Sequence, residues 1–267
     1  MSNAFELAEQ AAKFIRQESG IERHELALCL GSGWLKTLTG KITWSIDASK
    51  VPGFRRSEVE GFSDQISSIN LDSGKHVLVL PRTHLYQGHG VEAVAHPART
   101  AAAAGARIMV LTNGAGGLNP NWKPGQVFLI SDHINLTATS PIEGAKFVDL
   151  TDMYSPRLRN IAKQIDPSLE EVIYAQFRGP HYETPAEVKM VGVVGGHMVG
   201  MSTALEAIAA REVGLEVIAL SMQTNPAAGV VSGGVSHEHV LAAGEVGEQR
   251  NSALLAELCE ALSNHLD

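Results

Sequence analysis

The decisive stretch of this sequence is IMVLTNGAGG, residues 108–117, in which an apolar run is followed at once by a polar, glycine-rich segment. A short apolar run bounded by turn residues is typical of a buried strand, and we expect residues 112–117 to form a turn. Other short apolar runs end in the same way, each followed by Gly, Pro, Ser or Asn. They cover residues 26–30, 77–80, 127–130, 172–174 and 217–220.

Segments compatible with helices lie between several of these runs. They cover residues 97–106, with Pro97 near the start, 185–191, and 203–213 before Gly214. This alternation predicts an α/β fold, with a single domain over residues 1–267 and a central mixed, largely parallel sheet flanked by helices. We also expect a surface helix over residues 3–18 and a closing helix over 237–266, whereas the polar, glycine-punctuated residues 51–72 predict a loop.

Composition narrows the class of protein. Apolar residues make up 44% of the 267 residues and the formal net charge is -8, which predicts a globular protein with no general attraction to nucleic acid or anionic membranes. Residues 3–18 are expected to form a surface helix rather than an export signal, and no apolar stretch is long enough for a membrane span. Cys29 and Cys259 form no disulfide framework, so we expect a reducing cytoplasm.

Four polar or glycine-rich segments each follow an apolar run directly. They are Gly31-Ser32-Gly33, Arg82-Thr83-His84, residues 112–117 and Thr224-Asn225. In open α/β sheets, ligands bind at the carboxyl ends of the strands. The four segments are therefore predicted to form one shared site.

The residue types in these segments suit an anion such as phosphate. Ser32 offers a hydroxyl, Arg82 a guanidinium that can bind two phosphate oxygens, and the glycines offer backbone N–H groups that an anion can approach closely. Arg82 and His84, two residues apart on an extended segment, would face the same side. The alternative is that Arg82 pairs with a surface carboxylate and His84 caps a loop.

Other catalytic motifs do not match. Residues 31–37 lack the glycines of a Walker A loop, no GxGxxG is present, and Ala204 breaks a serine-hydrolase GxSxG around Ser202. His237 and His239 do not belong to an HExxH motif, although the pair could still bind a metal. Histidines at the start of a helix are more often structural or in contact with a ligand, so we expect neither a metal nor a cofactor.

Taken together, these strings resemble the trimeric purine nucleoside phosphorylase family, another branch of which acts on methylthioadenosine. The resemblance extends over most of the chain, because the matching strings occur in the family's order. They are LGSG, RTHLYQG, HPAR, LTNGAGGLN, GPHYETPAE, VGMST, TNPAAG and HEHVLAAG.

The resemblance implies a role for each matching residue. The implied phosphate ligands are Ser32, Arg82, Thr83, His84, Gly114 and Ser202. The implied purine contacts are Ala115, Gly116, Tyr182, Glu183 and Asn225, and the implied ribose contacts are Tyr86, Met201, His237 and Phe147. Asn225, Glu183 and His84 are the implied catalytic residues. Phe147 would come from a neighbouring subunit, so the resemblance also implies a homotrimer.

The implied activity is the cleavage of purine nucleosides by inorganic phosphate, which acts as a co-substrate. Phosphate stabilises the positive charge that develops on the ribose, and hydrogen bonds to the purine stabilise its negative charge. Asn225, in place of aspartate, favours 6-oxopurines, and His237 suits a 5′-hydroxyl. The expected substrates are therefore inosine and guanosine, with their deoxy forms.

The sequence departs from the family pattern at several positions. Phe62 stands where the family usually has a phosphate-binding histidine, Gly114 replaces an alanine, and Trp34 interrupts a glycine-rich segment. Two other functions remain open at this point. One is a hydrolase with Ser202 as nucleophile, and the other is a binding protein without turnover.

Overall fold

The computed structural model describes residues 3–31, 33–34, 42–56, 63–234 and 237–266, and the side chains of residues 237–241 lie outside this description. A nine-stranded sheet with the order β2-β3-β4-β1-β5-β8-β7-β6-β9 forms its centre. The strands are β1 (Leu26–Cys29), β2 (Ile42–Asp47), β3 (Gln65–Asn70), β4 (His76–Leu80), β5 (Ile108–Gly117), β6 (Val127–Asn135), β7 (Glu171–Gln176), β8 (Met198–Gly200) and β9 (Glu216–Pro226). The α-helices are α1 (Asn3–Ser19), α2 (Val91–Ala103), α3 (Pro156–Ile165), α4 (Pro185–Val193), α5 (Ala204–Glu212) and α6 (His237–Asn264). Short 3-10 helices are η2 (Ala48–Lys50) and η3 (Leu85–Gln87).

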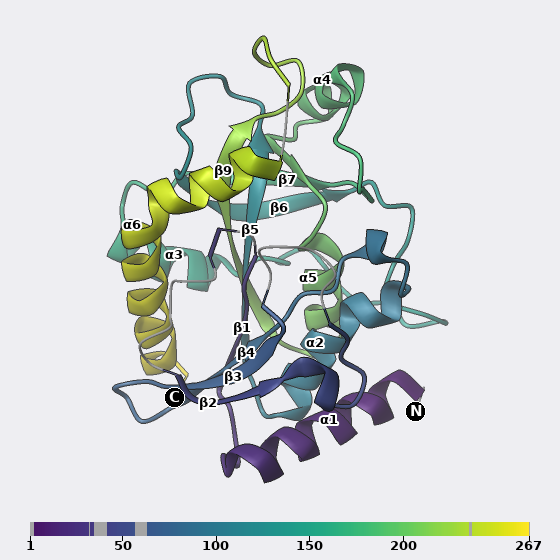
Figure 1. Cartoon of the computed structure of the whole chain (residues 1–267), viewed down its shortest axis with the longest axis vertical. Coiled ribbons are helices and arrows are strands. Elements are labelled where there is room, and N and C mark those ends of the chain that lie inside the picture. Colours follow the sequence, from purple (N-terminus) through teal and green to yellow (C-terminus); the bar gives the residue numbers. More distant parts are fainter. Residues whose placement is uncertain (1–2, 32, 35–41, 57–62, 235–236, 267) are drawn as a thin grey trace.

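The sheet is mixed, as predicted. Strands β4, β1, β5 and β9 lie next to one another in that order and run parallel. Strands β6, β7 and β8 are also mutually parallel, while β8 is antiparallel to β5 and β6 is antiparallel to β9. Because β9 pairs with both β5 and β6, this half of the sheet closes into a ring (Figure 1). The carboxyl ends of β4, β1, β5 and β9 therefore meet at one edge.

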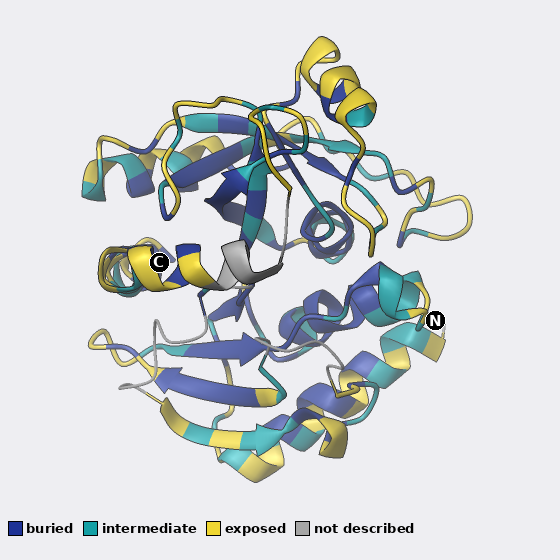
Figure 2. Ribbon diagram, turned by 45° about the horizontal axis from the view of Figure 1, so that its top comes forward, coloured by how far each residue is buried: buried dark blue, intermediate teal, exposed yellow. Residues whose placement is uncertain are grey.

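Helices cover both faces of the parallel strands (Figures 1 and 2). Alternate side chains of each strand point to opposite faces, so one apolar cluster packs against α1, α2 and α5 and a second against α3 and α6. A smaller third cluster joins α4 to β7 and β8. The predicted α/β fold with flanking helices is confirmed. None of the helices in the described part of the chain is long and apolar enough to cross a membrane.

The sequence located the terminal helices well and the second helix poorly. Helices α1 and α6 begin and end close to the predicted residues, but α2 begins at Val91 and contains Pro97 in its interior. The expected start at Pro97 was therefore wrong. Apolar burial explains the difference, because Val94, Ala95 and Ala98 are all buried and hold this helix against the sheet.

Residues 51–72 are not a loop throughout, because they contain β3. The central residues of this strand are buried although two of them are serines. Ser68 lies 2.7 Å from Nε2 of His24 and the hydroxyl of Ser67 donates to Ser45, so burial leaves neither hydroxyl unpaired. The polar residues of this segment are therefore compatible with a buried strand, which the sequence pattern did not predict.

The predicted turn at residues 112–117 is likewise part of a strand. β5 continues to Gly117 because β9 pairs with it as far as Gly117 and Pro226. Glycine leaves room for neighbouring side chains at the end of this strand, since a Cβ on Gly117 would lie 2.2 Å from Oε1 of Gln223 and 2.7 Å from Cε3 of Trp122. The polar residues therefore line the end of the sheet rather than leave it.

Candidate active site

Arg82 lies two residues after the end of β4, at the edge where the parallel strands end. Its Nε donates to both carboxylate oxygens of Glu206 at 2.9 and 3.0 Å, and Nη1 donates to the Thr112 carbonyl at 2.7 Å. The partner is a buried carboxylate, so the alternative of a surface ion pair is wrong. Burial acts to lower the pKa of Arg82 and Glu206 raises it, with a net upward shift that keeps the guanidinium charged. Nη2 is buried and has no hydrogen-bond partner within the described residues.

Gly31 and Trp34 both contact β5 close to Arg82. The N–H of Gly31 donates to Oγ1 of Thr112 at 3.0 Å. A Cβ at Gly31 would lie 2.5 Å from the Thr112 carbonyl oxygen and 2.7 Å from Nη1 of Arg82, so only glycine fits. Trp34 is fully buried and its Nε1–H donates to the Asn113 carbonyl at 3.0 Å. Trp34, which departs from the family pattern, therefore stabilises β5 at Asn113.

His84 lies beside Arg82 and is neutral. Burial, with a smaller contribution from the positive charge of Arg82, lowers the pKa of His84 to about 3. The imidazole stacks on Tyr86 with ring centroids 4.7 Å apart. His84 is also the residue before η3, and its backbone N–H donates to Oε1 of Gln87 at 2.6 Å. Thr83, between Arg82 and His84, is half-buried.

Ser202 follows β8 and is buried next to Thr203. Its N–H donates to the hydroxyl of Tyr174 at 3.3 Å, and its Oγ lies 3.2 Å from Oγ1 of Thr203. Nδ2 of Asn113 donates to the same Oγ1 at 2.9 Å. Because Asn113 precedes Gly114 in β5, these bonds join the Ser202 segment to the backbone of the predicted phosphate site.

Two of the predicted ribose contacts converge over Gly179. A Cβ on this glycine would lie 2.3 Å from Sδ of Met201 and 3.1 Å from Cδ1 of Tyr86. Met201 precedes Ser202, and Tyr86 stacks on His84. The predicted ribose and phosphate residues are thus adjacent.

Asn225 is held in β9 opposite Gly116 of β5. Its Oδ1 lies 2.7 Å from the hydroxyl of Thr224, which is also 3.0 Å from the Ala115 carbonyl. Its Nδ2 donates to the Pro226 carbonyl at 2.8 Å. A carbonyl only accepts hydrogen bonds and therefore fixes which end of the amide carries the nitrogen.

Glu183 lies in the segment between β7 and α4, next to the half-exposed Tyr182. Burial raises the pKa of Glu183, and its Oε1 is buried with no hydrogen-bond partner in the described part of the chain. Two residues further on, Pro185 packs on the segment that follows Asn225, since a Cβ on Gly229 would lie 2.7 Å from Cβ of Pro185. The two predicted purine-binding segments are therefore neighbours.

Some predicted residues cannot be placed. Ser32 and Phe62 lie outside the described residues, as do the side chains of His237 and His239. Within the described residues, no group of three or more His, Cys, Asp or Glu side chains is arranged to hold a metal ion.

Phe147 lies away from the other predicted residues and is 96% exposed. The preceding residue, Lys146, anchors this segment. Its Nζ donates to Glu212 at 3.3 Å and lies 5.2 Å from the ring centre of Phe5. Arg99 completes this anchor by donating to the same Glu212 at 2.8 Å. The backbone that carries Phe147 is thus tied to α1, α2 and α5 while the ring itself faces solvent.

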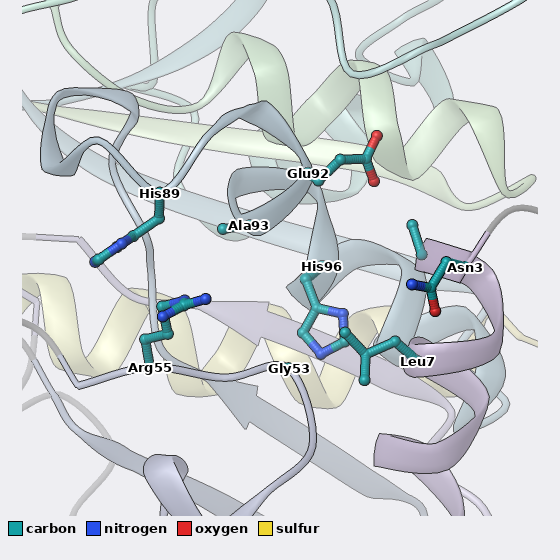
Figure 3. Close-up of a pocket in the computed structure, with 9 residues that line it drawn as sticks. Asn3, Leu7, Gly53, Arg55, His89, Glu92, Ala93 and His96 are labelled. Carbon is teal, nitrogen blue, oxygen red and sulfur yellow. The ribbon is translucent and has the colours of Figure 1, made fainter.

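A surface pocket of about 300 Å³ contains none of the predicted residues. It lies between the start of α1, residues 53–55 and α2, and Arg55, His89 and His96 line it together with Glu92 (Figure 3). Two of these groups are engaged elsewhere, because His96 is 2.9 Å from the Pro52 carbonyl and Glu92 accepts from Arg99. The strand-end site is therefore the stronger candidate.

Residues that the sequence did not single out also belong to the site. Glu206 and Tyr174 each contact a predicted residue directly. No sequence pattern could have identified them, since their partners are distant in the sequence. Thr224, which the sequence analysis did place in the site together with Asn225, contacts Oδ1 of that residue.

Most of the chain is similar to known proteins of one superfamily. Residues 27–260 match the model of the Phosphorylase superfamily. A purine nucleoside phosphorylase from Cellulomonas is 52% identical over 97% of this chain and 94% of its own length. The Mycobacterium tuberculosis purine nucleoside phosphorylase is 48% identical over 95% of each chain. A structure of Schistosoma mansoni purine nucleoside phosphorylase in complex with inosine superposes with a TM-score of 0.86, at 29% identity over 96% of both chains.

The chain therefore belongs to the purine nucleoside phosphorylases, within the Phosphorylase superfamily. The resemblance inferred from the sequence motifs is confirmed, and with it the assignment to the pentosyltransferases.

Proposed function

We propose that this protein cleaves 6-oxopurine nucleosides with inorganic phosphate, giving the free base and (deoxy)ribose 1-phosphate, in purine salvage. The observation that carries the proposal is a pair of buried groups at one edge of the sheet. Nη2 of Arg82 and Oε1 of Glu183 both lack hydrogen-bond partners among the described residues. A buried cation suits phosphate and a buried carboxylate suits the N–H groups of a purine. Inosine bound to the similar Schistosoma mansoni enzyme fits this assignment.

Phosphate would bind to Arg82, His84 and Ser202, together with the backbone at Gly114 and the segment at Ser32. The neutral imidazole of His84 can donate one hydrogen bond without adding a second positive charge. Positioned in this way, the phosphate attacks the anomeric carbon and stabilises the positive charge that develops on the ribose. Tyr86 and Met201 would hold the sugar.

Asn225 and Glu183 would stabilise the departing purine. The second N–H of Asn225 Nδ2 can donate to O6 or N7 of the base, which are both hydrogen-bond acceptors in the nucleoside. Glu183 as a carboxylate accepts from N1–H. This pattern of donors and acceptors favours hypoxanthine and guanine over adenine, because adenine carries an amine in place of O6.

A second copy of the chain would complete the ribose site with Phe147. A large aromatic ring that is 96% exposed is left almost uncovered by the described residues, which fits a contact with another subunit. Together with the family resemblance, this supports a homotrimer. Cys29 and Cys259 are both buried and neither forms a disulfide, which supports the reducing cytoplasm as the compartment.

The hydrolase alternative has less support. Within the described residues, the hydroxyl of Ser202 has Oγ1 of Thr203 as its neighbour at 3.2 Å rather than a histidine or carboxylate that could act as a general base.

One assay tests the proposal against both alternatives. Inosine is incubated with and without inorganic phosphate, and hypoxanthine and ribose 1-phosphate are measured. Phosphate-dependent release of both products is expected. Release without phosphate would indicate a hydrolase, and binding without release would indicate a non-catalytic protein.

A further inference from the structure

Glu206, in the first turn of α5, is a buried carboxylate that contacts two separate parts of the candidate phosphate site. Only 2% of its surface is exposed. Both oxygens accept from Nε of Arg82, at 2.9 and 3.0 Å, and Oε2 also accepts from the N–H of Thr203 at 2.6 Å. Oε1 accepts in addition from Sγ of Cys29 at 3.3 Å. The carboxylate is therefore saturated by protein donors and does not face a ligand.

The first consequence concerns the orientation of the guanidinium. Glu206 occupies Nε of Arg82, and the Thr112 carbonyl occupies Nη1. Two bonds on different nitrogens fix a planar guanidinium in position and in rotation. Nη2 is the nitrogen that remains, and it is the one without a partner in the described part of the chain.

The second consequence concerns the backbone that carries Ser202. Thr203 has a φ of 85°, which is costly for a β-branched residue and persists only where the surroundings fix it. Its N–H bond to Glu206 is one of these restraints, and its side-chain bond to Asn113 is another. Because Thr203 follows Ser202 directly, the carboxylate of Glu206 restrains the serine as well as the arginine.

We propose that Glu206 is a positioning residue for phosphate, holding Arg82 and the Ser202–Thr203 backbone at the spacing that the anion requires. The inference rests on the proposed function. It gives Glu206 a role beyond that of a counter-charge, because the two roles predict opposite effects when the charge is removed. Loss of a counter-charge alone would leave Arg82 more attractive to an anion, whereas loss of positioning weakens phosphate binding.

The test compares Glu206→Gln and Glu206→Asp with the unmodified enzyme, using steady-state kinetics with inosine and phosphate each varied. In the glutamine variant the amide NH₂ must face either the Arg82 and Cys29 donors or the Thr203 N–H, so one set of bonds is lost. We expect the KM for phosphate to rise roughly 10- to 100-fold, the effect of losing one hydrogen bond to a charged group. The KM for inosine should change by less than about threefold, the scale of a neutral surface change. Glu206→Asp retains both acceptor oxygens and should give an intermediate phosphate KM.

Glu216→Gln is the matched control. Glu216 also binds an arginine and a hydroxyl, Arg157 and Ser155, but it lies at the opposite end of β9. Its substitution should leave both KM values unchanged. Thermal unfolding with and without phosphate is measured on every variant. The phosphate-induced rise in Tm should shrink most in Glu206→Gln, less in Glu206→Asp and not at all in Glu216→Gln.

Two results would overturn the inference. One is a phosphate KM in Glu206→Gln that is unchanged or lower, whether or not Tm falls. The other is an equal rise in the KM values for phosphate and inosine, as a general loosening of the fold would produce. Failure of the proposed function is distinguishable, because the unmodified enzyme itself would then release hypoxanthine without phosphate or not at all.

Discussion

Replacement of Asn225 by aspartate should shift the enzyme from 6-oxopurine toward 6-aminopurine nucleosides. The Thr224 hydroxyl, 2.7 Å from Oδ1, can still donate to a carboxylate oxygen at this position. The other oxygen would replace Nδ2, which now donates to the Pro226 carbonyl at 2.8 Å and would supply the donor for O6. Asn225→Asp therefore removes one donor and puts an acceptor in its place.

The size of the shift follows from the hydrogen bonds exchanged. A 6-oxopurine loses a neutral hydrogen bond, at about 0.5–1.5 kcal/mol, and a 6-aminopurine gains one to a charged group, at about 1.5–3 kcal/mol. The sum, about 2–4.5 kcal/mol, corresponds to a change of roughly 30- to 2000-fold in the selectivity ratio. Both substrates should also react more slowly, because a carboxylate oxygen would face the Pro226 carbonyl.

The assay measures kcat/KM for inosine and for adenosine at saturating phosphate, by release of the base. Asn121→Asp makes the same chemical change at an exposed turn and should leave the ratio unaltered. An inosine-to-adenosine ratio in Asn225→Asp that equals that of the unmodified enzyme would refute the role assigned to Asn225.

Three other changes test separate parts of the site. Gly31→Ala places a Cβ 2.5 Å from the Thr112 carbonyl oxygen and 2.7 Å from Nη1 of Arg82. The free energy of unfolding, measured with denaturant, should therefore fall by about 1–3 kcal/mol, and the KM for phosphate should rise. Unchanged values of both quantities would contradict the packing argument. Burial raises the pKa of Glu183, so kcat/KM for inosine should fall as pH decreases through a pKa above the usual 4.5, and Glu183→Gln, although less active, should lack this acid limb. A raised pKa in the folded state stabilises the protein at pH values below the unfolded pKa, and this stabilisation is lost as the pH rises through the folded pKa. Near pH 7 the buried Glu183 carboxylate is therefore unfavourable, and Glu183→Gln should unfold at a higher temperature than the unmodified enzyme. A lower Tm would argue against the pKa shift. Phe147→Ala should leave monomer stability within about 0.5 kcal/mol but raise the inosine KM roughly tenfold, and an unchanged KM would exclude the ring from the ribose site.

The sequence by itself determined the family, the α/β class and the segments that carry the site. Short apolar runs report buried strands because a strand covered on both faces has little room for polar residues. The motifs after these runs then lie at the carboxyl edge, since parallel neighbours end on the same side. Arg82 and Asn225 could therefore be assigned to one site from their positions along the chain, whereas Ser202 was assigned to it only through the family resemblance.

Only the tertiary structure decided how polar residues are paired inside the protein. The sequence patterns that predicted a turn at residues 112–117 and a loop over residues 51–72 were misleading, because buried hydroxyls and amides there find partners on other strands. Arg82 and Glu206 are 124 residues apart, and no spacing rule joins them. Local periodicity reports which residues are buried, whereas the partner of a buried charge depends on how distant segments pack together. For that reason the sequence could predict which groups touch substrate, whereas only the fold shows that Glu206 contacts both Arg82 and the backbone next to Ser202.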